Sequence, residues 1–530
     1  MHRRFLFHNG IPPANMMFKT IVFAALLLLS TTDAHPKRGR GIEHVILLSI
    51  DGMHQKDLDV FVKNHPKSAF AALLKNGIEY QNAQTSKPSD SFPGLIAQIT
   101  GGSPKTTGIW YDNSWDRELF PPGSNCQGAR GVNALYDESI DFNDTLLDGG
   151  GGIDVAKLPL RLVGKKCLPE YPHNYIRVNT IFEVARKHKL HTAWTDKHFA
   201  YDIVHGPSGK GVEDLYTPEI NSIAAGLAAV QAYDRKYSVS IFTCDFMCHT
   251  RTSAASWNHT LTFVAFYPEL HWNAINNWIK GLDSAGKHEK GRATPNLFGG
   301  NFQSLSVVQK TDGYLKADGT PSPVVAQALL GIDAQLATLI ANLKKSGIYR
   351  KTLLIISAKH GQSPIDKTLL NKVDPDASSH VGSVPVAHFT GDDVGLLWLK
   401  NGSDSASAAA SLLTAAKTIG LLKLWEGPGV KTAGFGNPAT DSRVPDVIIQ
   451  TVPGVIYTAS KSKVAEHGGF NEDDLHVPII VHNPRFRAKK VSVPVSTRQI
   501  APSTLVALGL NPHELEAVVI EHTKPLPELF

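Results

Sequence analysis

This sequence of 530 residues lacks a strong charge of either sign and has few long apolar runs. Its 53 basic and 48 acidic side chains leave a net charge of only +5. So small a charge gives no electrostatic attraction toward nucleic-acid polymers or membrane surfaces. The apolar run Thr20–Leu29 spans roughly ten residues, too short to cross a bilayer comfortably. We see no second such segment and therefore expect a soluble mature chain without a membrane span.

Residues 1–34 have the composition of a secretory signal peptide. A basic region precedes the apolar run, and a short polar stretch after it ends at the small residue Ala34. We expect cleavage after Ala34 and a secreted protein. The glycosylation sequons at Asn143, Asn258 and Asn401 would then carry glycans wherever they are exposed.

Cysteine is also scarce, with four residues in the whole chain. This content suits an oxidising compartment. Cys126 and Cys167 lie in Gly- and Pro-rich sequence and could pair. Cys244 and Cys248 could pair with each other, stay reduced or bind a metal, and the sequence does not choose among these.

Strands that alternate with long helices predict an α/β fold. Gly41–Gly52 and Leu353–Ser357 are nearly continuous apolar runs, as central parallel strands are, and Ser238–Thr243 predicts another strand. We expect helices at Asp57–Asn76 and at Val324–Lys345, where apolar residues recur every three or four positions. The pattern predicts a central, mostly parallel sheet flanked by helices, with ligands at the carboxyl ends of its strands.

The rest of the chain, 35–530, is expected to form one large domain with insertions. The Trp- and His-rich segment at about 253–296 is interpreted as an insertion, and about 392–458 as a small lobe. The Gly-, Asp- and Pro-rich segment 102–170 is expected to form long loops.

Carboxylates and imidazoles follow several of these strands, together with a serine that opens a helix. Such a set suits metal-assisted phosphoryl or sulfuryl transfer, because zinc accepts both Asp oxygen and His nitrogen. The candidates are Asp51, Ser91, Asp245, His249, His360 and His467.

Each candidate also has a plainer interpretation. An Asp-Gly pair after a strand, as at Asp51, is often only a turn. Asp90 is better explained as the N-cap of the helix after Ser91 than as a catalytic group. His360 and His467 could be buried structural histidines. That all of these residues have only structural roles is a less plausible hypothesis than that they share one site.

In order and context these motifs resemble the alkaline phosphatase superfamily, and most of all its type I phosphodiesterase/nucleotide pyrophosphatase branch. The matching motifs are Ile50-Asp51-Gly52, Ser91-Phe92-Pro93, Thr100-Gly101 with Gly108-Ile109, Asp245-x-x-x-His249, His360-Gly361 and His467-Gly468. The resemblance implies an alkaline-phosphatase-like catalytic domain that carries two zinc ions.

The resemblance also implies a role for each candidate. Asp245, His249 and His467 would hold one zinc ion. Asp51, His360 and the Ser91 oxygen would hold the other. Ser91 would attack phosphorus in line and form a phosphoseryl intermediate, which water then hydrolyses.

The chain departs from the family pattern at two positions. Lys359 stands where the family has a metal-binding Asp, and a fixed cation there would weaken or replace the second zinc ion. Gly94 stands where the family has a phosphate-binding Asn, for which Asn113 could compensate. Asp196 and His198, after another strand, could supply a missing ligand or simply form a polar loop.

We therefore expect a secreted, metal-dependent hydrolase of phosphodiester or pyrophosphate bonds, with a small phosphorylated substrate such as a nucleotide. The alternatives are phosphomonoester or phosphonate hydrolysis on the same scaffold, or a degenerate member that binds a ligand without turnover. A sulfatase is disfavoured, because no arginine stands two residues after Pro93.

Overall fold

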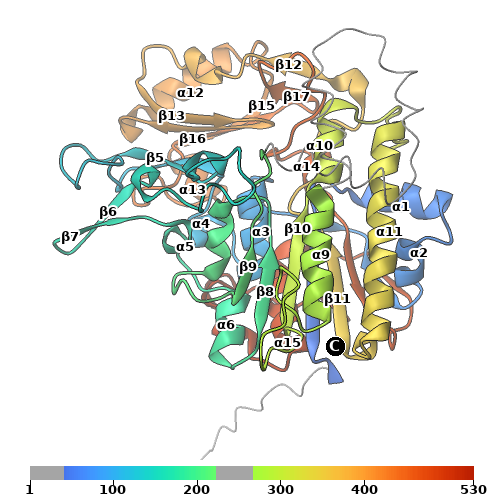
Figure 1. Cartoon of the computed structure of the whole chain (residues 1–530). Helices are drawn as coiled ribbons and strands as arrows, with labels where there is room; N and C mark the ends of the chain where they lie inside the picture. Colours follow the sequence, from blue (N-terminus) through green and yellow to red (C-terminus); the bar gives the residue numbers. More distant parts are fainter. Residues whose placement is uncertain (1–40, 223–266) are drawn as a thin grey trace, which may run out of the picture. The chain divides into compact units, whose positions relative to one another are not determined.

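The structure, a computed structural model, describes residues 41–222 and 267–530. Its main element is an eight-stranded mixed sheet (Figure 1). In spatial order the strands are β19 (Lys489–Val491), β2 (Gly77–Tyr80), β18 (Ile479–His482), β11 (Thr352–Ser357), β1 (His44–Ile50), β10 (Leu297–Phe302), β8 (Thr192–Thr195) and β9 (Asp214–Tyr216).

Most neighbouring strands of this sheet run parallel. β11, β1, β10, β8 and β9 form a continuous parallel set. β18 is antiparallel to both β11 and β2, whereas β19 is parallel to β2. The predicted fold class is confirmed, including the strands expected around residues 41–52 and 353–357. The strand expected at 238–243 lies outside the described residues.

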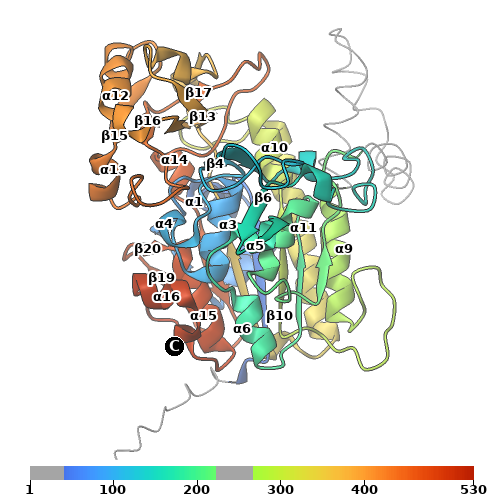
Figure 2. The same ribbon diagram turned by 90° about the vertical axis from the view of Figure 1, so that its left-hand side faces the viewer.

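Both faces of the sheet are covered, which explains why its central strands are mostly apolar and fully buried. Val45 and Leu47 of β1 point into one core cluster, whereas Ile46, Leu48 and Ile50 point into the other. The first cluster includes α3 (Ser91–Thr100), α6 (Ile181–Lys187), α15 (Ile500–Ala507) and α16 (Glu516–Glu521). The second includes α1 (Gln55–Asn64), α2 (Ala69–Leu74), α9 (Tyr267–Ile279), α10 (Ser304–Thr311) and α11 (Pro323–Lys345). Figure 2 shows α15 and α16 on one side of the sheet and α9 and α11 on the other.

Helix α11 matches its prediction closely. Ser322 caps it by accepting a hydrogen bond from the Val325 backbone N–H, and the expected apolar face is buried. Among the described residues it is the one helix long and apolar enough to cross a membrane by these two criteria. Its buried face packs under the sheet, and its Asp333 carboxylate accepts hydrogen bonds from Ala69 and Phe70 N–H. These contacts are those of a core helix.

The single helix predicted for 57–76 is wrong, because two helices, α1 and α2, occupy this segment. Pro66 disfavours helical backbone at the preceding residue, and His65 has φ −125° and ψ 66°. Ser68 then starts α2 by accepting a hydrogen bond from Ala71 N–H. The proline and the new cap are together sufficient to split the helix.

A second sheet of four strands occupies the segment predicted as a small lobe and some residues before it. Its order is β13 (Val386–Gly391), β14 (Val394–Leu399), β16 (Val447–Thr451) and β15 (Leu421–Glu426), all antiparallel. Helix α12 (Ser405–Thr414) packs on one face, around Leu397, Leu412 and Ile449. The prediction of an insertion at about 253–296 falls partly outside the described residues. From Tyr267 onward that segment forms α9, which contributes Trp272 and Trp278 to the main core.

The segment predicted as loops, 102–170, contains two hairpins. They are β4 (Asn113–Asp116) with β5 (Val132–Leu135), and β6 (Leu160–Val163) with β7 (Lys166–Pro169). The Cys126–Cys167 pairing is confirmed, with the two Cα atoms 5.7 Å apart. It ties β7 to the loop before β5. Cys244 and Cys248 lie outside the described residues.

Candidate active site

The candidate site lies at the carboxyl ends of the parallel strands β11, β1 and β8, with β10 between the last two. Asp51 follows β1, Lys359 and His360 follow β11, and Asp196 follows β8. The register pairs Ser49 with Ser357, so the chain leaves β1 and β11 at the same level. This edge of an open parallel sheet is where ligands bind in α/β folds.

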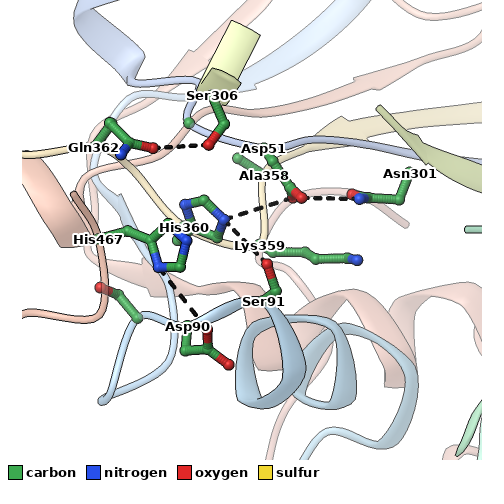
Figure 3. A network of polar contacts seen from close by, with 12 residues as sticks. Asp51, Asp90, Ser91, Asn301, Ser306, Ala358, Lys359, His360, Gln362 and His467 are labelled. Carbon is green, nitrogen blue, oxygen red and sulfur yellow. Dashed lines mark hydrogen bonds and ion pairs between the residues drawn. The ribbon is translucent and has the colours of Figure 1, made fainter. Parts of the chain in front are cut away.

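Ser91 is the first residue of α3, a helix whose ten residues are all buried. Asp90 caps the helix by accepting a hydrogen bond from Phe92 N–H, as predicted. The Ser91 hydroxyl oxygen lies 3.1 Å from the Lys197 ammonium. Figure 3 shows it facing His360, whose Nε2 is 3.3 Å away. A helix N-terminus and an ammonium both stabilise negative charge. Ser91 therefore has the surroundings of an oxygen nucleophile.

His360 faces this serine with an unprotonated nitrogen. Its Nδ1 lies 2.7 Å from the Gly361 carbonyl oxygen, which can only accept, so Nδ1 carries the proton. Nε2 is left with a lone pair directed toward Ser91 and toward Asp51 Oδ1, 3.9 Å away. Burial lowers the pKa of His360 to about 4, so the ring is neutral near pH 7.

Asp51 presents one free carboxylate oxygen to the same place. Its Oδ2 accepts a hydrogen bond of 2.9 Å from Asn301 Nδ2, while Oδ1 has no hydrogen-bond partner among the described residues. Burial alone would raise the pKa of Asp51, but the positive charge of Lys359, together with Lys197 and the hydrogen bond from Asn301, outweighs it and holds the pKa below its ordinary value. The carboxylate is thus ionised and buried, and only one of its two oxygens has a hydrogen-bond partner among the described residues.

His467 completes this part of the site. Its ring lies against that of His360, with centroids 3.9 Å apart, and its Nδ1 is 3.8 Å from Asp90 Oδ1. Nδ1 has no hydrogen-bond partner among the described residues. Burial and the neighbouring His360 hold the pKa of His467 well below its ordinary value. Its expected partners Asp245 and His249 lie outside the described residues.

Acidic groups lie on the far side of His467. One ligand atom each of Asp392, Glu466 and His467 lies within 4.8 Å of the others. Glu466 already pairs with Lys310 at 2.7 Å and with Lys463, and Asp392 accepts a hydrogen bond from the Tyr111 hydroxyl. Both Glu466 oxygens and one Asp392 oxygen are therefore already occupied.

Lys359 points away from Ser91 and forms a buried ion pair. Its ammonium lies 3.0 and 3.1 Å from the two oxygens of Asp196 and 4.0 Å from the Tyr201 ring centroid. Asp196 also accepts hydrogen bonds from Trp194 Nε1 and from Lys197 N–H. The structure therefore places Asp196 as the counter-ion of Lys359, with both carboxylate oxygens already occupied.

The remaining candidates lie at different distances from this centre. His198 is buried between the rings of Phe92 and Tyr201, and burial holds its pKa well below the ordinary value. Asn113 starts β4, where its carbonyl accepts a hydrogen bond from Thr390 in β13. Asn113 makes no hydrogen bond to Ser91 within the described ranges.

Gly94 has a structural reason to be glycine. A Cβ atom there would lie 2.2 Å from the Lys359 carbonyl oxygen and 3.0 Å from its Cα. Helix α3 thus packs directly on the backbone of residue 359, and a larger side chain at position 94 would push the two apart. The two positions at which the chain departs from the expected motif, Gly94 and Lys359, are therefore in direct contact.

Two functional residues were missed by the motif analysis. Asn301 lies within β10, in an apolar strand with no recognisable motif, although it contacts Asp51 across 250 residues of sequence. Lys197 stands between the predicted Asp196 and His198, and its positive charge beside two candidate residues was a usable signal.

Comparisons with known proteins identify the family and the fold. A model of the type I phosphodiesterase/nucleotide pyrophosphatase family matches residues 45–473. The structure of wild-type alkaline phosphatase PafA is 13% identical over 92% of this chain and 98% of its own, with a TM-score of 0.60. Murine ectonucleotide pyrophosphatase/phosphodiesterase 5, solved in an inactive form with AMP, is 14% identical over 89% of this chain and 96% of its own, with a TM-score of 0.54. At these identities the two structures show a shared fold. No curated protein matched in the sequence comparison.

Proposed function

This chain belongs to the type I phosphodiesterase/nucleotide pyrophosphatase family, and on that premise we propose that it is a zinc-dependent hydrolase of phosphodiester or pyrophosphate bonds with Ser91 as its nucleophile. The observation that carries the proposal is the convergence on the Ser91 oxygen. An ammonium and an imidazole lone pair face the hydroxyl at a helix N-terminus, and a free carboxylate oxygen lies 3.9 Å from the same imidazole nitrogen.

The buried donor atoms fit zinc. Asp51 Oδ1 and His467 Nδ1 have no hydrogen-bond partner among the described residues, and the lone pair of His360 faces the first of them. A buried polar group without a partner is costly, and a bound zinc ion would satisfy these two atoms. His467 would hold one ion with Asp245 and His249, and Asp51, His360 and the Ser91 oxygen are the donors that a second ion would use. Bound zinc would favour the alkoxide form of Ser91 and neutralise charge on the phosphoryl oxygens.

The protein's own groups account for the steps at Ser91. The Ser91 hydroxyl releases its proton to water, and its oxygen attacks phosphorus and becomes the phosphoseryl oxygen. The alcohol or phosphate leaving group departs on the opposite side and takes up a proton from water. Lys197 donates a hydrogen bond to the attacking oxygen, and the N-terminus of α3 stabilises the charge that develops on the phosphoryl group. Water then hydrolyses the phosphoserine and restores the hydroxyl.

We propose a small phosphorylated substrate, such as a nucleotide, and a secreted, glycosylated protein. The AMP complex of the murine structural relative supports the nucleotide. The confirmed disulfide between Cys126 and Cys167 and the exposed positions of Asn143 and Asn401 are compatible with secretion.

The test compares hydrolysis of a nitrophenyl nucleotide diester with that of nitrophenyl phosphate, in zinc and after chelation. We expect zinc-dependent cleavage of the diester, and a loss of at least about 10³-fold in Ser91→Ala because no nucleophile remains. Ser103→Ala is a matched control, since the hydroxyl of this serine donates to the Glu521 carboxylate instead of facing the site. Cleavage of the monoester alone would make the protein a phosphatase, and binding of AMP without turnover would make it a ligand-binding member of the family.

A further inference from the structure

Lys359 removes one carboxylate from the zinc site at Ser91. The resemblance implies an Asp at this position, beside Asp51, His360 and Ser91. With lysine instead, Asp51, His360 and Ser91 are the donor groups that remain among the described residues. A buried positive charge is also added next to them. Both changes weaken the binding of a divalent cation, because ligand count and site charge set its affinity.

The Lys359 side chain cannot readily swing into a different arrangement. Its backbone carbonyl accepts a hydrogen bond of 2.5 Å from Thr85 Oγ1 and lies against Gly94 of α3. Its ammonium is fully buried, paired with the fully buried Asp196 and placed over the Tyr201 ring. Leaving this position would strand the Asp196 carboxylate without its charge partner.

Lys197 brings a second positive charge, and this one reaches the nucleophile. Its ammonium is 3.1 Å from the Ser91 oxygen, while its backbone N–H donates to Asp196 Oδ1. Asp196 therefore links the two lysines: it neutralises Lys359 and fixes the backbone from which Lys197 extends. The unusual lysine and the cation at the serine belong to one hydrogen-bonded unit.

We propose that this chain works with a single zinc ion, and that the Lys197 ammonium supplies at Ser91 the positive charge that the second zinc ion of the family would supply. The inference rests on the proposed function and concerns the same site. An ammonium neutralises one unit of charge on the serine oxygen and donates a hydrogen bond to it. The Lys197 ammonium is covalently part of the chain, so zinc is not needed in that position.

The first test measures zinc per chain by native mass spectrometry and by elemental analysis of the full-length protein after equilibration with zinc. We expect one ion in the wild type. Two ions together with diester hydrolysis would overturn this inference and leave the proposed function intact. No bound zinc together with no hydrolysis would instead contradict the proposed function, and this inference with it.

A matched pair of variants tests the role of residue 359. Both carry Asp196→Asn, which removes the counter-ion, and they differ only in Lys359→Asp or Lys359→Met. The Asp variant restores the expected carboxylate, and we expect it to bind two zinc ions, while the Met variant keeps one. Equal zinc content in the two folded variants would show that residue 359 does not decide the count, which contradicts the inference.

Lys197→Met tests the replacement of charge directly. In the wild-type background we expect kcat to fall about 10²-fold, with partial recovery in Lys197→Arg. In the Lys359→Asp, Asp196→Asn background the same substitution should cost less than about 10-fold, because a second zinc ion now stabilises the serine oxygen. Equal losses in both backgrounds would mean that Lys197 acts independently of the missing ion, and the inference would fail.

Discussion

The two sides of the site around Asp51 differ in whether their buried polar groups have partners. On the paired side, Lys359 and Asp196 satisfy each other, and Trp194 and Lys197 N–H complete the carboxylate. On the open side, buried atoms of Asp51 and His467 have no hydrogen-bond partner within the described residues. The first arrangement is complete without a ligand and the second is not, so the same kind of residue is structural on one side and poised to bind on the other.

The largest effect is expected from breaking the paired side. Lys359→Met leaves Asp196 as a buried carboxylate without its charge partner, and removal of one member of a buried pair typically costs about 3–5 kcal/mol. Burial already raises the pKa of Asp196 and lowers that of Lys359, so each charge depends on the other. Urea unfolding of the zinc-free protein should show this loss in the free energy of unfolding.

The control for this prediction is the double variant Lys359→Met, Asp196→Asn. It removes both charges and should recover most of the stability, because no uncompensated charge remains. A single variant as stable as the wild type would show that the pair contributes nothing to folding, and the contrast between the two sides would lose its basis.

On the open side, we expect the free energy of unfolding to fall at acid pH because of His360. The folded pKa of His360 is about 4, against an ordinary value of 6.5, because burial disfavours the charged ring. The unfolded chain therefore binds more protons between these two values. Stability from the neutral His360 is fully present above pH 6.5 and is lost as the pH falls toward 4, by about 3 kcal/mol.

This prediction is measured as the free energy of unfolding of zinc-free protein between pH 7 and pH 4. His360→Gln, which cannot titrate, should show a shallower decline than the wild type. Identical pH dependence of the two proteins would mean that His360 is not held neutral by burial in the folded chain.

The sequence was sufficient where a local pattern determines structure. The helix at 323–345 has a cap and a regular apolar face, and the strands before Asp51 and His360 are apolar because helices cover both faces of the sheet. The break at Pro66 also had a local signal, which the longer apolar pattern obscured.

Long-range contacts were beyond the sequence. Motif order brought Asp51, Ser91 and His360 into one predicted site, and the structure places them together. No pattern showed that Lys359 turns toward Asp196, 163 residues away, or that glycine at position 94 accommodates the backbone of residue 359. Such partners are chosen by tertiary packing, so only the fold reveals which polar groups stay unpaired.

The smallest effect is expected at Asn301, which belongs fully to neither the paired side nor the open side. Its amide holds Asp51 Oδ2 at 2.9 Å and thereby aims Oδ1 at the place where His360 and Ser91 converge. Groups that orient a metal ligand typically change metal affinity by about 10–100-fold when removed. In the Lys359→Asp, Asp196→Asn variant, which should bind the second zinc ion, Asn301→Ala should therefore weaken the binding of that ion by about 10-fold, measured by competition with a chelator.

Asn296, just before the other end of β10, provides the matched control for Asn301. Its side chain donates to the Glu43 carbonyl and accepts from His191 N–H, both at the opposite edge of the sheet. Asn296→Ala should lower stability without changing zinc affinity. Equal zinc affinity in the two variants would mean that Asp51 keeps its orientation without Asn301, and that its unpartnered oxygen is held by the strand alone.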